Sequence, residues 1–308
     1  IGSPKERVEI AVRPDGRVRV VIGTQPSGQG HETSFAQVIA DLLAVPFESV
    51  DVIMGDTDIV IAGGGSHSGR SMRHAATVIA KATPEMIARG KQIAALVLRT
   101  AADKIEFTGG RFGSGQSNRT FDLLELAKEA TRITLPAALK DGLSVAADNE
   151  MHDPVFPNGC AVCEIEVDPD TGGTVITRYA AVDDVGRCIN PMIVDGQTHG
   201  SIAQGVGEAM WEHCVIDANS GQPLCGSFMD YGMPRSNNLP SFATEIVEVL
   251  SPTNPLGIKA GGEGGTTPAL AVVINALVDA LKPYGVRDIT MPATPFTVWQ
   301  AIEVANTR

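Results

Sequence analysis

The sequence predicts an α+β protein that consists of two units of mixed β-sheet with packed helices. Three observations support this fold class. The 308 residues, 43% of them apolar, suffice for a large core and, by length alone, for two domains or one large one. Strand-like stretches come in pairs, with helical stretches spread between the pairs instead of alternating with single strands. The chain contains no low-complexity tract and no short-period repeat.

The first elements indicate a hairpin followed by a helix. Residues 8–12 alternate between apolar and polar, Pro14-Asp15-Gly16 supplies a turn, and residues 18–22 return as a second strand. A glycine-rich loop over 23–30 then leads to a helix that we expect to begin near His31, because apolar residues follow at helical spacing.

The next stretch predicts a strand and a long helix. Pro46 ends the first helix, and residues 50–54 have the composition of a strand. A second glycine-rich loop covers 63–71 and precedes a helix to about Ala102, which we expect to be interrupted near Pro84.

The middle of the chain carries a domain boundary. Glycine, serine and asparagine over 109–119 indicate a tip or hairpin, and residues 122–132 form a short amphipathic helix. Residues 141–157 have weak periodicity and two prolines. We therefore divide the chain into a first half, 1–145, and a second half, 146–308.

The second half repeats the pattern of paired strands and helices. We expect Met229, Met233, Trp211 and Trp299 to be core residues. A third glycine-rich loop covers 257–267. The predicted strands are 161–167, 174–182 and 243–250, and the predicted helices are 191–210, 268–281 and 296–304.

Charge and composition exclude several classes of function. Acidic residues outnumber basic ones 36 to 24, which gives a net charge of −12 and a surface that repels nucleic acid. No apolar run approaches the roughly 20 residues of a membrane span. Five cysteines, an odd number, argue against a disulfide scaffold and for a reducing compartment, so we expect a cytoplasmic location. Because Ile1 is no initiator methionine, we expect a piece of a longer polypeptide or a processed subunit.

Each of the three glycine-rich loops precedes a helix. Glycine allows close approach of a ligand to the backbone, and the free N–H groups at a helix start suit phosphate oxygens. One such loop is as consistent with an ordinary turn or helix cap, but three together favour a large phosphate-bearing ligand. The pattern matches neither a P-loop nor a dinucleotide fingerprint.

Glu263 is a lone carboxylate among four glycines. In a dry site its pKa would rise and it would act as a general base, although a solvated turn glutamate fits the pattern as well. Cys160 and Cys163 resemble half of a metal site, but residues three apart on a strand face opposite ways. Neither a zinc site nor a serine nucleophile elbow is indicated.

Six segments, in order between about Val18 and Leu281, together resemble the molybdenum hydroxylase family of xanthine dehydrogenases, aldehyde oxidases and aerobic CO dehydrogenases. The resemblance is to the C-terminal, molybdopterin-binding part of the large subunit, and it implies the fold of a molybdenum cofactor-binding domain. The family's preceding half is absent from this sequence. The segments are Gly28-Gln29-Gly30-His31-Glu32-Thr33, Met54-Gly55-Asp56-Thr57-Asp58, Ser68-Gly69-Arg70-Ser71, Asp184 to Pro191, Asp195 to Gly200, and Lys259 to Thr266.

The resemblance implies an oxidoreductase that hydroxylates an aldehyde or an aromatic N-heterocycle with oxygen from water. Glu263 resembles the family's catalytic base, which takes a proton from the attacking oxygen. Electrons would leave for [2Fe–2S] clusters and FAD on partner subunits or domains. The implied partners are the N-terminal half of the large subunit, these iron–sulfur and FAD subunits, and a small-molecule substrate, in a dimer of heteromers. We predict little or no activity for the isolated chain.

The implied cofactor is a molybdopterin whose dithiolene holds the molybdenum, so no side chain is expected to ligate the metal. Gly28, Gln29 and Gly30 would meet the dithiolene side, with the Gln29 amide offered to a molybdenum oxo ligand. Room and donors in the second loop favour the cytosine dinucleotide form. That loop would hold the pyrophosphate or nucleotide, and it comprises Ser66, His67, Ser68, Gly69, Arg70 and Ser71. Asn190, Ile193 and Gln197 would line the pterin. His31 and Gly262 are the remaining residues that we expect to bind the cofactor.

Two departures from the family pattern concern the shape of the site. His31 stands where some members have an apolar or small residue, and Gly261 and Gly262 stand where a bulkier residue often precedes the base. Likeness to CO dehydrogenase does not imply CO oxidation, because the copper loop lies outside this chain. The alternative is a cofactor-free scaffold or an inactive fragment of the same family; the joint presence of Gln29, Gln197 and Glu263 favours the enzyme.

Overall fold

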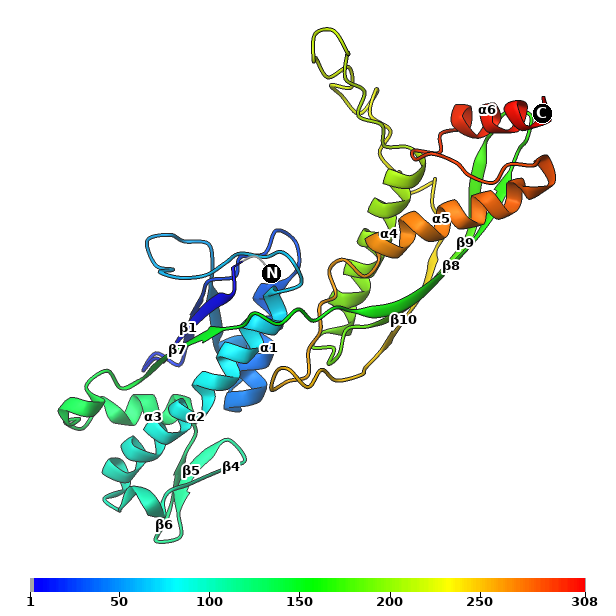
Figure 1. Cartoon of the computed structure of the whole chain (residues 1–308). Coiled ribbons are helices and arrows are strands. Elements are labelled where there is room, and N and C mark those ends of the chain that lie inside the picture. The colour runs from blue at the N-terminus through cyan, green and yellow to red at the C-terminus, as the bar shows by residue number, and fades with distance from the viewer. Residues whose placement is uncertain (1–2, 308) are drawn as a thin grey trace. The chain divides into compact units, whose positions relative to one another are not determined.

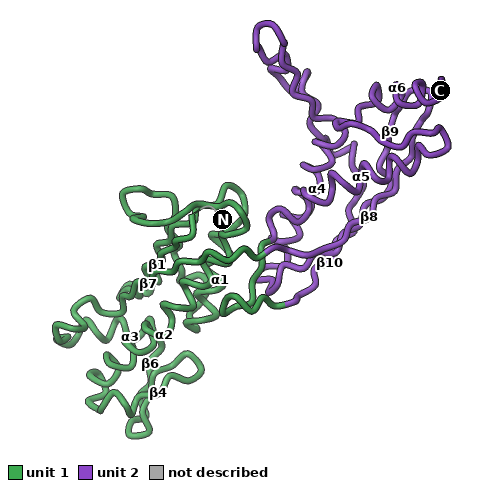
Figure 2. The backbone as a smooth tube through the Cα atoms, in the orientation of Figure 1, with its two compact units in different colours: residues 1–155, 250–260 green, residues 156–249, 261–308 purple. Residues whose placement is uncertain are grey.

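The computed structural model describes residues 3–307, and Ile1, Gly2 and Arg308 lie outside the described residues. The chain forms two compact units (Figure 2). Unit 1 comprises residues 1–155 and 250–260, and unit 2 comprises residues 156–249 and 261–308. Each unit has its own sheet and packed helices, which confirms the predicted α+β class.

A four-stranded sheet is the centre of unit 1 (Figure 1). Its order is β3-β2-β1-β7, with β1 antiparallel to both neighbours and β2 parallel to β3. Val8 and Ile10 point into the core, as the alternation predicts, and the hairpin is confirmed. The strands are β1 (Lys5–Val12), β2 (Val18–Ile22), β3 (Val50–Ile53) and β7 (Leu143–Glu150).

Two helices pack against this sheet. Helix α1 (His31–Leu43) begins at the predicted residue, and its Phe35 and Ile39 are completely buried. Helix α2 (Ser71–Leu98) runs without a break through Pro84, so the predicted interruption is wrong. Pro84 lies on the exposed side, while Met86 on the other face packs in the core, and this burial outweighs one lost backbone hydrogen bond.

A small antiparallel sheet and a short helix complete unit 1. The sheet, of order β4-β5-β6, contains the predicted hairpin. Helix α3 starts with a capping box in which Asp122 and Glu125 satisfy each other's backbone N–H groups. The bounds are β4 (Glu106–Thr108), β5 (Arg111–Ser114), β6 (Ser117–Phe121) and α3 (Leu123–Ala130); short 3-10 turns are η1 (Phe47–Ser49), η2 (Ala102–Lys104) and η3 (Ala137–Leu139).

Unit 2 has a three-stranded sheet of order β10-β9-β8, antiparallel between β8 and β9 and parallel between β9 and β10. Tyr179 of β9 packs with Ile202 and Val206 of α4 and Val273 of α5. A second cluster joins α5 to α6. The elements are β8 (Asn158–Val167), β9 (Thr174–Asp184), α4 (Pro191–Met210), β10 (Phe242–Val247), α5 (Thr266–Leu281), η4 (Lys282–Tyr284) and α6 (Pro295–Asn306).

The residues after α4 correct one expectation. Met229 is 90% exposed and Met233 is 47% exposed, so the prediction that they are core residues is wrong. Both lie on a segment that extends beyond the end of α4, where no sheet covers them (Figure 1). Trp211 is partly buried, but Trp299 is 37% exposed, so the prediction that Trp299 is a core residue is wrong as well. Among the described residues, no helix has both the length and the apolarity to cross a bilayer.

Candidate functional site

The predicted site residues fall into two groups, one in each unit. In unit 1 they follow β2 and precede α2, and in unit 2 they surround the start of α4 and the start of α5. The first group is Gly28, Gln29, Gly30, His31 and Ser66 to Ser71, and the second is Asn190, Ile193, Gln197, Gly262 and Glu263.

The first glycine loop ends at the start of α1. Gly28 and Gly30 have φ of 114° and 68°, a region that favours glycine. Gly30 caps α1 without any side-chain hydrogen bond, so no side chain blocks the helix N-terminus. The Gln29 Oε1 accepts from the Ser27 N–H at 2.5 Å, which folds the loop on itself. A helix start of this kind suits an electron-rich ligand.

The side chain of His31 belongs to the core of unit 1. It is 8% exposed, its ring stacks on Phe35 with centroids 4.7 Å apart, and its Nδ1 lies 3.3 Å from the Ser34 Oγ. Burial lowers the pKa of His31 to about 4, against a smaller opposing effect of Glu32. His31 is therefore neutral at pH 7 and offers a ligand its backbone more than its ring.

Glycines let the second loop lie directly on the first. A Cβ atom on Gly63 would lie 2.1 Å from the Cα of Gly23, so only glycine fits at this crossing. A Cβ atom on Gly69 would lie 2.3 Å from the Ala260 Cβ, which shows how closely residues 250–260 pack on the same loop. The two predicted loops of unit 1 are thus neighbours in space.

Arg70 holds this loop together from inside. Its side chain is completely buried, and all five of its guanidinium N–H groups have acceptors. Arg70 therefore organises the loop, and its guanidinium does not face a ligand. The acceptors are the carbonyl oxygens of Ser3, Lys5 and Gly65, the Thr24 Oγ1 and the Glu6 Oε2, at 2.7–3.0 Å.

Other groups of the loop are available to a ligand. The Ser66 and Ser71 hydroxyls lie 2.6 Å apart at the start of α2, and His67 and Ser68 are exposed. In the first turn of α2, the buried Arg73 Nε and His74 Nε2 have no hydrogen-bond partner. Burial and the nearby arginines lower the pKa of His74 to about 4. Unpaired donors beside an unblocked loop fit an anionic, phosphate-bearing group.

The second group begins at the N-terminus of α4. The Asn190 Oδ1 caps this helix by accepting from the Ile193 N–H at 3.0 Å, and Pro191 occupies the first helical position. Ile193 and Gln197 lie about one turn apart on α4, and both are partly buried. The asparagine oxygen is thus committed to the helix, while Gln197 projects from a fixed position.

The Glu263 loop is fastened to α4. The Ser201 Oγ donates to the Gly262 carbonyl at 2.9 Å, and the Thr266 Oγ1 donates to the Ser201 carbonyl at 3.0 Å. A Cβ atom on Gly265 would lie 2.7 Å from the Thr198 carbonyl oxygen. Glu263 itself is exposed on this anchored loop, so the dry environment expected from the sequence is not formed by the described residues.

Sequence reasoning missed Asp183, which lies under the same loop. Its carboxylate is 6% exposed, accepts from the Thr198 Oγ1 at 3.2 Å, and would lie 3.6 Å from a Cβ atom on Gly264. Burial raises the pKa of Asp183, against the smaller effect of the Thr198 hydrogen bond. The doublet Asp183-Asp184 at the end of a strand was the available signal, because one of two successive strand residues must face inward.

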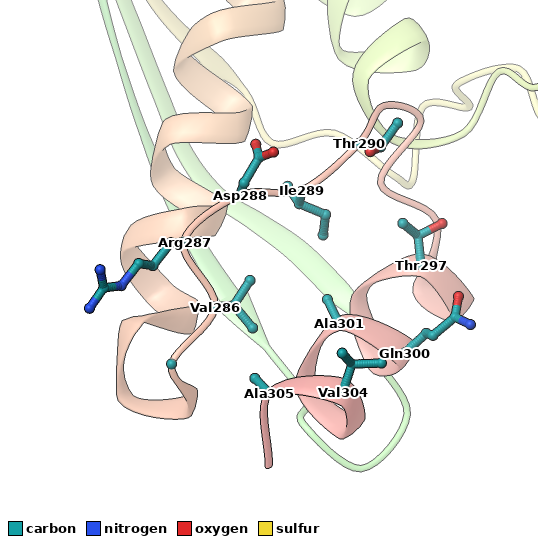
Figure 3. Close-up of a pocket in the computed structure, with 11 residues that line it drawn as sticks. Val286, Arg287, Asp288, Ile289, Thr290, Thr297, Gln300, Ala301, Val304 and Ala305 are labelled. Carbon is teal, nitrogen blue, oxygen red and sulfur yellow. The ribbon is translucent and has the colours of Figure 1, made fainter. Parts of the chain in front are cut away.

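A pocket elsewhere in unit 2 contains none of the predicted residues. It has a volume of about 700 Å³ and lies between residues 285–290 and α6 (Figure 3). Its lining combines apolar side chains such as Val286 and Val304 with Thr297 and Gln300. Among the described residues, no three His, Cys, Asp or Glu side chains are grouped to bind a metal ion.

Comparisons with known proteins identify a family that this chain resembles. The family model of the molybdopterin cofactor-binding domain matches residues 1–240. The 6-hydroxypseudooxynicotine dehydrogenase complex subunit gamma of Paenarthrobacter nicotinovorans is 34% identical over 96% of this chain and 37% of its own length. This chain thus spans just over a third of that relative.

Two solved structures also match nearly the whole of this chain. Reconstituted CO dehydrogenase from Oligotropha carboxidovorans superposes with a TM-score of 0.88 and 31% identity, over 98% of this chain and 37% of that one. Quinoline 2-oxidoreductase from Pseudomonas putida 86 gives a TM-score of 0.86 and 33% identity, over 97% of this chain and 38% of that one. The fold of the whole chain is therefore that of part of a larger enzyme chain.

Proposed function

The chain belongs to the molybdopterin cofactor-binding domain family, as the C-terminal part of a molybdenum hydroxylase large subunit, and on this premise we propose its reaction. The complete enzyme hydroxylates an aldehyde or an aromatic N-heterocycle with oxygen from water. The substrates named for two similar proteins, 6-hydroxypseudooxynicotine and quinoline, support a heterocyclic substrate. A CO dehydrogenase is about as similar, so similarity alone does not select the substrate.

The residues of both units suit a pterin dinucleotide. Gly28, Gln29 and Gly30 would meet its dithiolene side, and Ser66 to Ser71 would hold its pyrophosphate or cytosine nucleotide. The unblocked start of α1, the paired serine hydroxyls and the unpaired donors of the first turn of α2 support this assignment. In unit 2, Asn190, Ile193, Gln197 and Gly262 would line the pterin. When bound, the cofactor supplies the two-electron redox chemistry that these side chains lack.

The proposal rests chiefly on one observation, the position of Glu263 on an anchored loop. Its loop is tied to α4 through Ser201 and Thr266, and the carboxylate stays exposed, where a substrate reaches it. Held in this way, Glu263 accepts the proton of the attacking water oxygen as a general base. The buried Asp183 lies beside the same loop, 3.6 Å from the position that a Cβ atom on Gly264 would take.

The complete enzyme requires partners. The rest of the large subunit would cover the exposed side of the Glu263 loop, and iron–sulfur and FAD subunits would accept the electrons. We propose a dimer of such heteromers in the cytoplasm, and little or no turnover by the isolated chain.

The test is Glu263→Gln in the complete enzyme. The variant should keep molybdenum and the CMP released by acid hydrolysis, yet lose turnover by about 10²–10⁴-fold, the typical contribution of a general base. Glu303→Gln, an exposed change on α6, is the matched control and should leave turnover unchanged. Turnover of Glu263→Gln at the wild-type rate would reject Glu263 as the base.

A cofactor-free scaffold is the competing proposal. Elemental analysis of the complete complex distinguishes the two, because an enzyme should contain about one molybdenum and one CMP per large subunit. Neither molybdenum nor CMP in a complex with all its partners would favour the scaffold, and Glu263 would then be an ordinary loop residue.

A further inference from the structure

Unit 2 carries an extended arm, residues 212–235, between the end of α4 and β10 (Figure 1). The arm contains an antiparallel bridge between Ile216 and Pro223 and turns around Asp217 and Gly221. Several of its apolar side chains are exposed, among them Phe228 at 73% and Met229 at 90%. Because it has little core of its own, a few hydrogen bonds hold its two strands together.

The pairing of these strands places two cysteines opposite each other. The Leu224 N–H donates to the Val215 carbonyl at 2.8 Å, and the Asp217 N–H donates to the Gln222 carbonyl at 2.9 Å. With Ile216 opposite Pro223, the next pair in the same register is Val215 opposite Leu224, and the pair after it is Cys214 opposite Cys225. Hydrogen-bonded pairs alternate with non-hydrogen-bonded ones, and Cys214 and Cys225 fall in a non-hydrogen-bonded position.

This position has the geometry of a disulfide site. Non-hydrogen-bonded pairs bring the Cα atoms to about 4.5 Å, within the range of about 4.4–6.8 Å that disulfides use. The two Sγ atoms lie 3.9 Å apart as free thiols, so side-chain rotation closes the remaining gap without moving the backbone. Cys214 is exposed and Cys225 is partly exposed, so a small oxidant reaches them.

The other cysteines lack such an arrangement. On β8, Cys160 lies opposite Val182 and Cys163 lies opposite Tyr179 of the neighbouring strand. Cys188 donates its backbone N–H to Glu248, far along the chain from the arm. Neither cysteine of the arm is among the residues assigned to the cofactor, so this inference does not rest on the proposed function.

We propose that Cys214 and Cys225 form a reversible disulfide that closes the arm under oxidising conditions. The oxidant is a low-molecular-weight disulfide such as oxidised glutathione. The thiolate of one cysteine attacks it and releases one glutathione thiol; the second cysteine then attacks the resulting mixed disulfide and releases the other. Two protein thiols are oxidised, one glutathione disulfide is reduced to two thiols, and the arm is linked across its base.

Peptide mapping of the full chain tests the proposal. After incubation with oxidised glutathione and blocking of residual thiols, free thiols should fall from the five in the sequence to three. An aspartate-specific protease cuts before Asp195, Asp217 and Asp230, so residues 195–216 and 217–229 should stay joined until a reductant is added.

Matched variants decide between the possible linkages. Cys214→Ser and, independently, Cys225→Ser should each abolish the joined peptides, whereas Cys163→Ser and Cys188→Ser should leave them unchanged. Protection of the arm from limited proteolysis should appear in the oxidised wild type and disappear on reduction. Peptides that separate without reductant, with glutathione or the blocking group on both cysteines, or a linkage through Cys188, would overturn the proposal.

Discussion

Arg70 and Glu6 form an ion pair in the interior of unit 1. Both side chains are 0% exposed, and the Arg70 Nη2 lies 3.0 Å from the Glu6 Oε2. Glu6 also accepts from the Gly23 N–H at 3.0 Å and from the Thr24 Oγ1 at 2.6 Å. Since the pair connects β1, the first glycine loop and the start of α2, it sets the positions of both loops that we assign to the cofactor.

We expect Glu6→Gln to destabilise unit 1 by about 3–5 kcal/mol, because removal of one partner leaves the buried guanidinium uncompensated. Urea denaturation followed by far-UV circular dichroism measures the change. Asp148→Asn is the control, since it breaks the exposed Arg7–Asp148 pair and should cost much less. Equal effects of the two variants would mean that burial of the Arg70–Glu6 pair has no special role.

The sequence could predict where the loops lie but not which way each side chain turns. Glycine clusters before helices are local signals, and all three precede a helix in the structure. The inward direction of Arg70 depends on Glu6, which lies 64 residues away along the chain. Asp183 likewise depends on Thr198, which lies on another element 15 residues further along the chain. Long-range partners of this kind leave no mark in a local pattern.

The crossing of α4 and α5 positions the Glu263 loop at the level of secondary structure. The helices touch where Gly205 faces Thr266 and Ala269. A Cβ atom on Gly205 would lie 2.6 Å from the Thr266 carbonyl oxygen and 2.8 Å from the Ala269 Cβ. The glycine therefore lets α5, and with it the adjoining Glu263 loop, approach α4.

Gly205→Ala should destabilise unit 2 by about 1–3 kcal/mol, because the added methyl group forces the two helices apart. Gly200→Ala in the same helix is the matched control: no atom lies within 4 Å of its Cβ position, and the change should stabilise α4 by about 0.5–1 kcal/mol. Urea unfolding followed by tryptophan fluorescence reports both effects. Two variants that change stability in the same direction would contradict this account of the crossing.

Elements with strong local signals were predicted well. Helix α4 has the predicted bounds, because Asn190 and Pro191 mark its start. The predicted interruption of α2 at Pro84 was wrong, because core packing on the opposite face keeps the helix continuous. The exposed methionines of the arm were also predicted wrongly, because residue type alone does not reveal whether a neighbouring element covers them.

Over the whole molecule, the two units differ in how they respond to acid. In unit 1, His31 and His74 have pKa values lowered to about 4, chiefly by burial. The folded state therefore resists protonation, and the stability that each neutral histidine contributes is lost as the pH falls from about 6.5 towards 4. A shift of this size corresponds to at most about 3 kcal/mol per histidine.

In unit 2, Asp183 changes the stability with pH in the opposite direction. Burial raises its pKa above the ordinary value of 3.8, so the folded state favours the protonated carboxyl. The contribution of Asp183 to stability is fully present below pH 3.8 and is lost as the pH rises through the raised pKa. Acidification should therefore lower the stability of unit 1, because its buried histidines become protonated, whereas protonation of Asp183 contributes stability to unit 2.

The aromatic residues allow the two units to be followed separately. Both tryptophans, Trp211 and Trp299, lie in unit 2, whereas far-UV circular dichroism reports the helices of both units. At pH 5, we expect thermal unfolding to begin by circular dichroism at a lower temperature than by tryptophan fluorescence, with a smaller separation at pH 7. His31→Phe keeps the stacking on Phe35 and should reduce the separation, while His152→Gln, at an exposed site, should not. If the two signals coincide at both pH values, or if His31→Phe has no effect, the buried histidines do not govern the acid sensitivity of unit 1. Coinciding signals would also mean that the two units unfold as one cooperative body.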